Sequence, residues 1–216
     1  MVDPSHAKRY KKSEIERIVD VLLREGYPDG ISIPVDIDLL AQQDSRVDDI
    51  IPADLEDRFR VAAVLLYKPN RRTFDILFDE NTPRGRTSFS IAHEFGHVVL
   101  HGEVCKVCET LDAAIELRTR LRRRYSQMET DADYFARSIL MPRTRVLQDT
   151  AELYKGLVEL YGVNATLIQT KLCPCLAKEY RVSIRAMEVR LEHLGLQKEV
   201  MKAIQSNFST LDIRLL

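Results

Sequence analysis

The sequence His-Glu-Phe-Gly-His, at residues 93–97, constrains the fold of this chain more than any other feature. Because an α-helix completes a turn in about 3.6 residues, histidines four positions apart lie on nearly the same face, and both can bind one metal ion. Glu94 would then lie beside the ion. The flanking apolar residues follow helical spacing: Ile91, Phe95, Val98 and Val99. The pattern therefore predicts a buried helix whose metal-binding face carries His93 and His97.

The expected helix has a predicted start and a predicted end. A start near Thr87 or Ser88 is favoured, because a hydroxyl oxygen at the N-cap accepts a hydrogen bond from a backbone N–H of the first turn. His101 continues the histidine series, but its Cα would lie about 12 Å beyond that of His93 along an unbroken helix. We therefore expect His101 to end the helix and to make no contact with the ion.

A second helical pattern, which begins at Glu129, supplies the candidate third ligand. Its apolar residues recur at helical spacing: Ala132, Phe135, Ala136, Ile139 and Leu140. Glu129 and Asp133 are four residues apart, so their carboxylates face the same side. We expect Glu129 to bind the metal and Asp133 to accept the spare N–H of a ligating histidine. The alternative is a solvated acidic face. Three protein ligands with one open position are typical of a catalytic zinc ion.

The two segments together resemble the ImmA/IrrE family of bacterial and phage metallopeptidases. The resemblance rests on His-Glu-Phe-Gly-His-Val-Val-Leu-His followed by Glu-x-Asp-Ala-Asp-x-Phe-Ala, and it extends from about residue 14 to about residue 196. This chain has Asp131 where the family more often has Glu. The resemblance implies an α+β fold: a mainly helical zincin-like metallopeptidase domain with a small β-sheet and a C-terminal segment similar to a helix-turn-helix.

The resemblance also implies a function. Members of the family typically cleave a helix-turn-helix transcriptional repressor, often encoded nearby, and so relieve repression. We therefore expect a zinc-dependent endopeptidase in which Glu94 takes the proton of the attacking water. Manganese is a second candidate cofactor, because family members also use it and a site of nitrogen and oxygen ligands accepts it.

A different class of function stays open at this point. The chain would then be a non-catalytic, metal-containing transcriptional regulator or an antitoxin-type partner, which binds DNA or protein through its C-terminal helices. Glu94 argues against this hypothesis, because a structural metal site has no use for an acid beside an open position. A metallohydrolase for small molecules is a third hypothesis.

Composition and charge limit the kinds of partner and the cellular location that we expect for the protein. A chain of 216 residues with 45% hydrophobic residues can bury a substantial core. A net charge of −1 provides no general attraction to nucleic acid or to acidic membranes, so direct DNA binding is not favoured. The N-terminal residues lack the apolar stretch of a secretory signal, and no run is long enough to span a membrane. We expect a cytoplasmic protein.

The chain is expected to divide into a zincin-like domain over residues 1–156 and a C-terminal helical subdomain over residues 157–216 packed on it. In the first part, spacing and caps predict two helices, over 13–23 with Ser13 as cap and over 36–43. Two β-branched runs, 61–67 and 73–78, predict a hairpin before the metal-binding helix. In peptidases of this kind an edge strand commonly lines the cleft and pairs with an extended substrate.

The C-terminal part predicts a helix, a turn and a second helix over residues 176–194. Ser183 is the expected N-cap of the second helix, and three residues are expected on its polar side: Arg185, Arg190 and His193. Such an arrangement can bind DNA, but it also occurs as a plain packing element. From Gln197 onwards we expect a helix or a tail that contacts a partner.

Three further groups of residues invite a functional interpretation. Five arginines precede Glu129: Arg118, Arg120, Arg122, Arg123 and Arg124. We interpret them either as a solvated helix face or as a rim that attracts an acidic partner. Four cysteines form a CxxC pair, Cys105 and Cys108, and a CxC pair, Cys173 and Cys175. Three interpretations stay open: a second, structural zinc site, a redox pair, or unrelated thiols. Four tyrosines are candidate donors to the oxyanion of a peptidase: Tyr125, Tyr134, Tyr154 and Tyr161.

Overall fold

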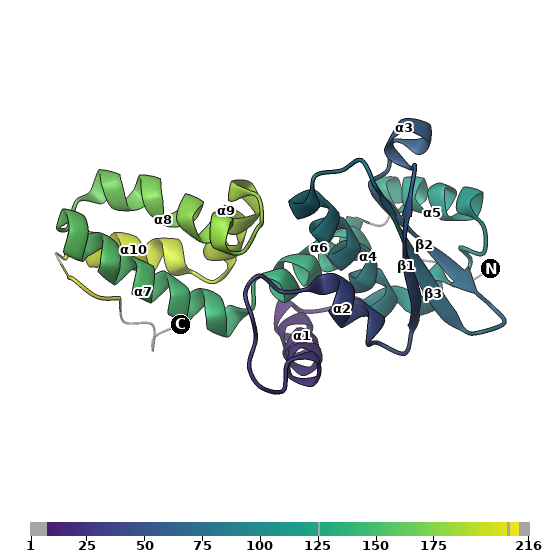
Figure 1. Cartoon of the computed structure of the whole chain (residues 1–216), viewed down its shortest axis with the longest axis horizontal. Coiled ribbons are helices and arrows are strands. Elements are labelled where there is room, and N and C mark those ends of the chain that lie inside the picture. The colour runs from purple at the N-terminus through teal and green to yellow at the C-terminus, as the bar shows by residue number, and fades with distance from the viewer. Residues whose placement is uncertain (1–7, 125, 207, 212–216) are drawn as a thin grey trace. The chain divides into compact units, whose positions relative to one another are not determined.

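The protein is a mainly helical α+β structure with two compact units (Figure 1). This computed structural model describes residues 8–124, 126–206 and 208–211, without the side chains of residues 120–124 and 126. The first unit takes in the chain up to Gly30 and Asp36–Leu140, and the second takes in Ile31–Val35 and the chain from Met141. Among the described residues, no helix has the length and apolar character needed to cross a membrane.

Two helices open the first unit. Helix α1 (Lys12–Gly26) begins after Lys11, whose backbone N–H donates to the side chain of Glu14, so that Lys11 and not Ser13 occupies the cap position. Helix α2 (Ile37–Gln42) confirms the prediction of a short helix here, and the side chain of Asp36 accepts a hydrogen bond from the backbone N–H of Leu39. Both helices bury an apolar face.

A three-stranded sheet follows, with the order β1-β3-β2. Strands β2 (Ala63–Lys68) and β3 (Thr73–Asp79) pair in antiparallel fashion, which confirms the hairpin. Strand β1 (Val47–Ala53) pairs with β3 in parallel and was not predicted, because its polar residues and Pro52 interrupt the apolar pattern. The short helix α3 (Glu56–Phe59) lies between β1 and β2. Strand β2 is therefore at an edge of the sheet.

The helix that carries the HExxH sequence, α4 (Arg84–Cys105), is longer than expected at both ends. It begins after Pro83, and the expected caps lie within its first turns, where Ser88 Oγ donates to the carbonyl oxygen of Arg84. The backbone leaves the helical conformation at His101, with φ −131° and ψ 17°. His101 therefore ends the first helical segment as expected, and a short second segment continues to Cys105.

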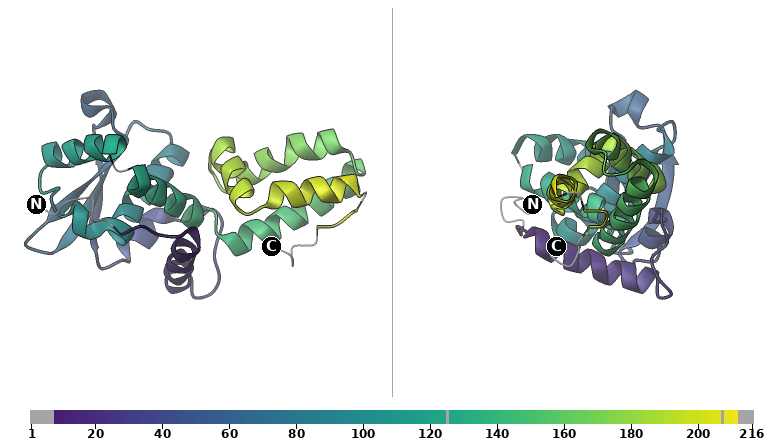
Figure 2. Two further views of the ribbon diagram at one scale, coloured as in Figure 1. Left: turned by 180° about the vertical axis from the view of Figure 1, so that it is seen from behind. Right: turned by 90° about the vertical axis from the view of Figure 1, so that its left-hand side faces the viewer.

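Two further helices complete the first unit, which Figure 2 shows from behind. Helix α5 (Leu111–Arg124) packs against β2, and α6 (Ser126–Leu140) packs along α4. The close approach of α4 and α6 requires Gly96, because a Cβ atom at this position would lie 3.0 Å from Cδ1 of Phe135 and 3.3 Å from Cα of Ala132. A larger residue would push the two helices apart.

In the part of the second unit that the structure describes there are four helices: α7 (Arg143–Tyr161), α8 (Ala165–Glu179), α9 (Ile184–His193) and α10 (Leu196–Gln205). The sequence analysis placed a boundary after residue 156, which lies inside α7. The contacts divide the chain after Leu140 instead, because the buried residues of α7, such as Val146 and Tyr154, belong to the core of the second unit.

Helices α8 and α9 form the expected helix-turn-helix-like segment, and Ser183 caps α9 by accepting a hydrogen bond from the backbone N–H of Ala186. The prediction for Arg190 was wrong. Its side chain is fully buried, and its Nε donates to the carbonyl oxygen of Met141 at 2.9 Å. Arg190 therefore stabilises the core of this unit and is not available on a polar surface.

Candidate metal centre

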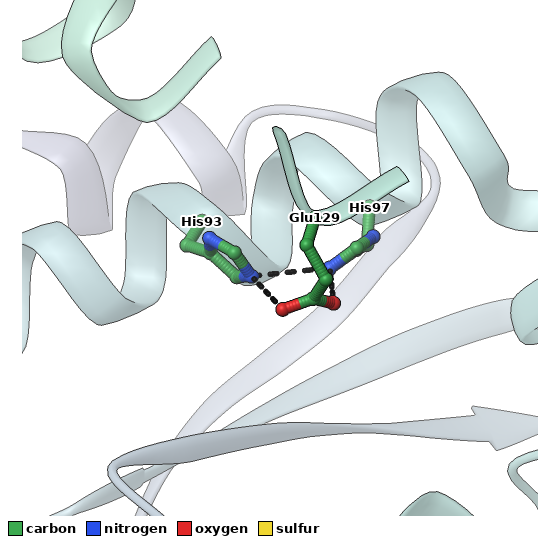
Figure 3. A group of neighbouring side chains, drawn as sticks. All are labelled: His93, His97 and Glu129. Carbon is green, nitrogen blue, oxygen red and sulfur yellow. Dashed lines mark hydrogen bonds and ion pairs between the residues drawn. The ribbon is translucent and has the colours of Figure 1, made fainter. Parts of the chain in front are cut away.

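Three side chains from two helices meet in the first unit (Figure 3). Helix α4 contributes His93 and His97, and α6 contributes Glu129. The Nε2 atom of His97 lies 3.2 Å from Oε1 of Glu129, and Nε2 of His93 lies 3.7 Å from Oε2 of the same carboxylate. The two Nε2 atoms are 3.1 Å apart.

These separations fit a tetrahedral metal ion. Two ligands that each lie about 2.1 Å from a tetrahedral zinc ion are about 3.4 Å from one another. The side chains of His93 and His97 are buried, and Glu129 is partly buried. Nitrogen and carboxylate ligands in this number are those of catalytic zinc sites, which leave a fourth position open. The three side chains are therefore arranged to hold one divalent ion.

Asp133 lies behind His93, in the position expected for an outer partner. Its Oδ1 is 3.1 Å from Nδ1 of His93, and its Oδ2 accepts a hydrogen bond from Arg137. Burial alone would raise the pKa of Asp133, but the hydrogen bond from His93 and the charges of His93 and Arg137 outweigh it and lower that pKa. An ionised Asp133 favours a proton on Nδ1 of His93, which leaves Nε2 free to bind a cation.

The charge state of Glu129 also suits a metal ligand. Burial alone would raise the pKa of Glu129, but the hydrogen bond with His97 and the charges of His97 and His93 lower it to about 2. The carboxylate is therefore ionised near neutral pH. His93 and His97 bind a cation through the lone pair of a neutral imidazole nitrogen.

Glu94 lies outside the group of three and is almost fully buried. Together with His97 and Glu129 it lines a cavity of about 30 Å³. Its Oε1 lies 2.5 Å from Nη1 of Arg118, and the same nitrogen donates to the carbonyl oxygen of Ala63 at 2.7 Å.

The structure corrects the interpretation of Arg118 as part of a solvated or rim-forming run of arginines. Only 19% of its side chain is exposed, and it pairs with Glu94 beside the candidate metal centre. The side chains of the other four arginines lie outside the described residues: Arg120, Arg122, Arg123 and Arg124. The spacing of residues in the sequence contained no signal for the pair, because 24 positions separate its members.

His101 lies next to the centre but does not join it. Its ring is buried and its centroid is 5.7 Å from that of His97. Burial, with the nearby His97, lowers the pKa of His101 to about 3. The ring is therefore neutral near pH 7, and it packs edge-on against Tyr10, whose hydroxyl donates to the carbonyl oxygen of Leu100.

The cysteines form no metal-binding group among the described residues, where the one such group is His93, His97 and Glu129. Cys105 and Cys108 are buried in the first unit, and burial raises the pKa of Cys105 well above its usual value and that of Cys108 to about 12. Cys173 and Cys175 belong to α8 in the second unit. Buried thiols of this kind are poor nucleophiles and poor metal ligands.

Two of the tyrosines proposed as oxyanion donors have other hydrogen-bond partners. Tyr134 donates to Glu16 at 2.8 Å, and Tyr154 donates to the carbonyl oxygen of Phe208 at 2.9 Å. Tyr161 ends α7 in the second unit, and Tyr125 lies outside the described residues. The tyrosines that the structure describes do not line the small cavity, where the cationic side chain is Arg118.

Comparison with known protein families assigns the chain. Residues 55–192 match the model of the IrrE N-terminal-like domain, peptidase M78, which covers more than half of the sequence. The chain belongs to the IrrE N-terminal-like family. The matched segment of this peptidase M78 chain contains α4, α5 and α6, and so all of the candidate metal centre. No curated protein matches the chain closely enough to count as a relative.

Membership of peptidase M78 supports a metallopeptidase-type function and implies a bound metal. The coordinates agree, since His93, His97 and Glu129 offer a site with the spacing that such an ion requires. The family match and the local geometry are two different observations, because one concerns sequence similarity along 138 residues and the other the positions of three ligand atoms.

Proposed function

We propose that this protein is a zinc-dependent endopeptidase. His93, His97 and Glu129 would hold the ion, and Glu94 would act as general base. The observation that supports this proposal best is the convergence of the three ligand atoms within 4.8 Å of one another, with Glu94 lining the same cavity. Manganese would satisfy the same ligands, and reconstitution of the metal-free protein with each ion would decide between them.

The residues of the chain would share the chemistry as follows. A divalent ion, when bound, polarises the scissile carbonyl and lowers the pKa of water. Glu94 would take a proton from the attacking water and return it to the leaving amine. Asp133 would keep the proton of His93 on Nδ1 and so orient the ring. Arg137 holds Asp133 from the opposite side.

We further propose that the substrate is a helix-turn-helix repressor encoded near the gene for this protein. Support for this substrate comes from the resemblance to the ImmA/IrrE family, and it is an argument by analogy. Cleavage would make the chain an anti-repressor in transcription regulation. Incubation with the products of neighbouring genes, with and without a chelator, tests the substrate directly.

A pair of matched variants tests the chemistry. Glu94→Gln removes the base but keeps its shape, so the variant should bind one metal ion per chain and lose cleavage. Glu103→Gln makes the same change on α4, at a side chain that is 81% exposed, and should behave as the wild type. Metal content by mass spectrometry and cleavage by gel would be measured on both. Equal cleavage by Glu94→Gln would refute the role of Glu94, and equal derepression in cells by that variant would favour a non-catalytic regulator.

A further inference from the structure

The cavity at the candidate metal centre is too small to hold a peptide. Its volume of about 30 Å³ is far below the roughly 300–1,000 Å³ of a typical ligand-binding pocket. Four of the residues that line it come from α5 and from the segment before it, and we call them the covering layer: Cys108, Ala114, Leu117 and Arg118. A peptide bond can therefore reach Glu94 only if this covering layer moves.

The same layer occupies the edge of the sheet. Strand β2 is at the edge, and two of its backbone groups that do not pair with β3 already have partners. The carbonyl oxygen of Ala63 accepts a hydrogen bond from Arg118, and the N–H of Tyr67 donates to the carbonyl oxygen of Cys108 at 2.7 Å. An extended peptide that adds to a sheet edge needs such backbone groups. The covering layer and an added strand therefore compete for β2.

Apolar contacts hold α5 in this place. Ala114 and Leu117 are buried and belong to one hydrophobic cluster with Val64 of β2, Val104 of α4 and Met128 of α6. Figure 1 shows α5 beside the sheet, next to β2. The helix therefore bridges the edge strand and the two helices that carry the metal ligands.

Arg118 is the polar residue of α5 that joins both features. One nitrogen, Nη1, contacts the carboxylate of Glu94 and the carbonyl oxygen of Ala63. Its Nε is buried and has no hydrogen-bond partner among the described residues. The paired carboxylate of Glu94 is buried as well, and a charge-assisted hydrogen bond between buried groups is strong. Arg118 thus engages the proposed base and the edge strand at once.

We propose that Arg118 latches α5 over the candidate metal centre, so that the chain rests in a closed state which must open before a peptide can bind. The effect of the latch on cleavage rests on the proposed peptidase function. The closed state itself is inferred from the contacts of Arg118 alone. Opening breaks the pair with Glu94, frees the base and exposes the edge of β2. A substrate that pairs with β2 would replace the contacts that the opening removes.

Two variants test the latch from its two sides. Arg118→Gln and Glu94→Gln each remove one charge of the pair, and the second is nearly isosteric, so it tests the latch even if the first does not fold. Arg71→Gln is the matched control, because Arg71 also pairs with a carboxylate, that of Asp48, but its side chain is 68% exposed and does not line the cavity. Amide hydrogen exchange would be followed for Tyr67 and residues 111–119, with and without zinc.

We expect exchange at these amides to be about tenfold faster in Arg118→Gln and in Glu94→Gln, corresponding to about 1.4 kcal/mol, and unchanged in Arg71→Gln. The double variant should open no more than either single variant, because both remove the same contact. Cleavage of an unstructured peptide by the zinc-loaded protein should rise about tenfold in Arg118→Gln and disappear when Glu94→Gln is added.

The outcomes separate this inference from the proposed function. Unchanged exchange in both single variants would overturn the latch while the peptidase stands. The same holds if the wild type cleaves the peptide and Arg118→Gln cleaves it no faster. Faster exchange with no cleavage by any variant would overturn the proposed peptidase and leave the closed state supported. Additive exchange in the double variant would show that Arg118 and Glu94 do not act as a pair, which also overturns the latch.

Discussion

Gly96 sets the distance between the two helices that carry the candidate ligands, and its replacement by alanine gives a quantitative test. The added Cβ atom would lie 3.0 Å from Cδ1 of Phe135. Carbon atoms in contact prefer about 3.5–4.0 Å, so the ring of Phe135 and helix α6 must move away from α4 by a few tenths of an ångström. Metal ligands tolerate errors of about 0.2 Å. The change should therefore move His97 and Glu129 too far apart to share an ion well.

The effect on stability combines two opposing contributions. Alanine is favoured over glycine in a helix by about 1 kcal/mol, whereas overpacking costs about 1–3 kcal/mol. We expect the free energy of unfolding of the metal-free protein to fall by up to about 2 kcal/mol. Gly156→Ala is the matched control, because a Cβ atom at this position of α7 meets no atom within 4 Å. That variant should gain up to about 1 kcal/mol.

Urea unfolding of the metal-free protein and a competition titration with a zinc chelator measure both effects. We expect zinc affinity to fall at least about tenfold in Gly96→Ala, equivalent to about 1.4 kcal/mol, and to stay the same in Gly156→Ala. If Gly96→Ala were stabilised as much as Gly156→Ala and bound zinc with unchanged affinity, the close packing of α4 on α6 would not be what positions the ligands.

Three further predictions follow from the site. Asp133→Asn should weaken zinc binding about 10–100-fold in a chelator competition, because the ring of His93 loses its partner, and unchanged affinity would contradict that role. The pKa of Glu129 lies below its usual value, so ionised Glu129 contributes stability to the metal-free protein above about pH 4.5 that is lost as pH falls toward about 2. In Glu129→Gln the free energy of unfolding should therefore depend less on pH in this range, and an identical pH dependence would refute the lowered pKa. Iodoacetamide should label Cys175 before Cys105 and Cys108, since the thiol of Cys175 is exposed while the other two are buried with raised pKa values. Mass spectrometry would follow the order of labelling, and earlier labelling of Cys105 or Cys108 would contradict this prediction.

Part of the fold follows from local sequence. Helix α2 and the β2–β3 hairpin were predicted because caps, β-branched residues and spacing are local signals. Strand β1 was not predicted, because its partner β3 lies more than 20 residues away and its own pattern is polar. Helix boundaries shifted for a similar reason: Pro83 starts α4 through backbone geometry, while the hydroxyls of Thr87 and Ser88 form hydrogen bonds with backbone carbonyls.

By itself, the sequence determined that His93 and His97 share one face of a helix and that Glu129 and Asp133 share one face of another, because helical periodicity is a local property. Tertiary structure alone decided which carboxylate faces which histidine, since that depends on how closely α4 and α6 approach at Gly96. It also decided the pairing of Arg118 with Glu94. A contact between residues 24 positions apart depends on the packing of whole helices, and no local pattern in the chain encodes it.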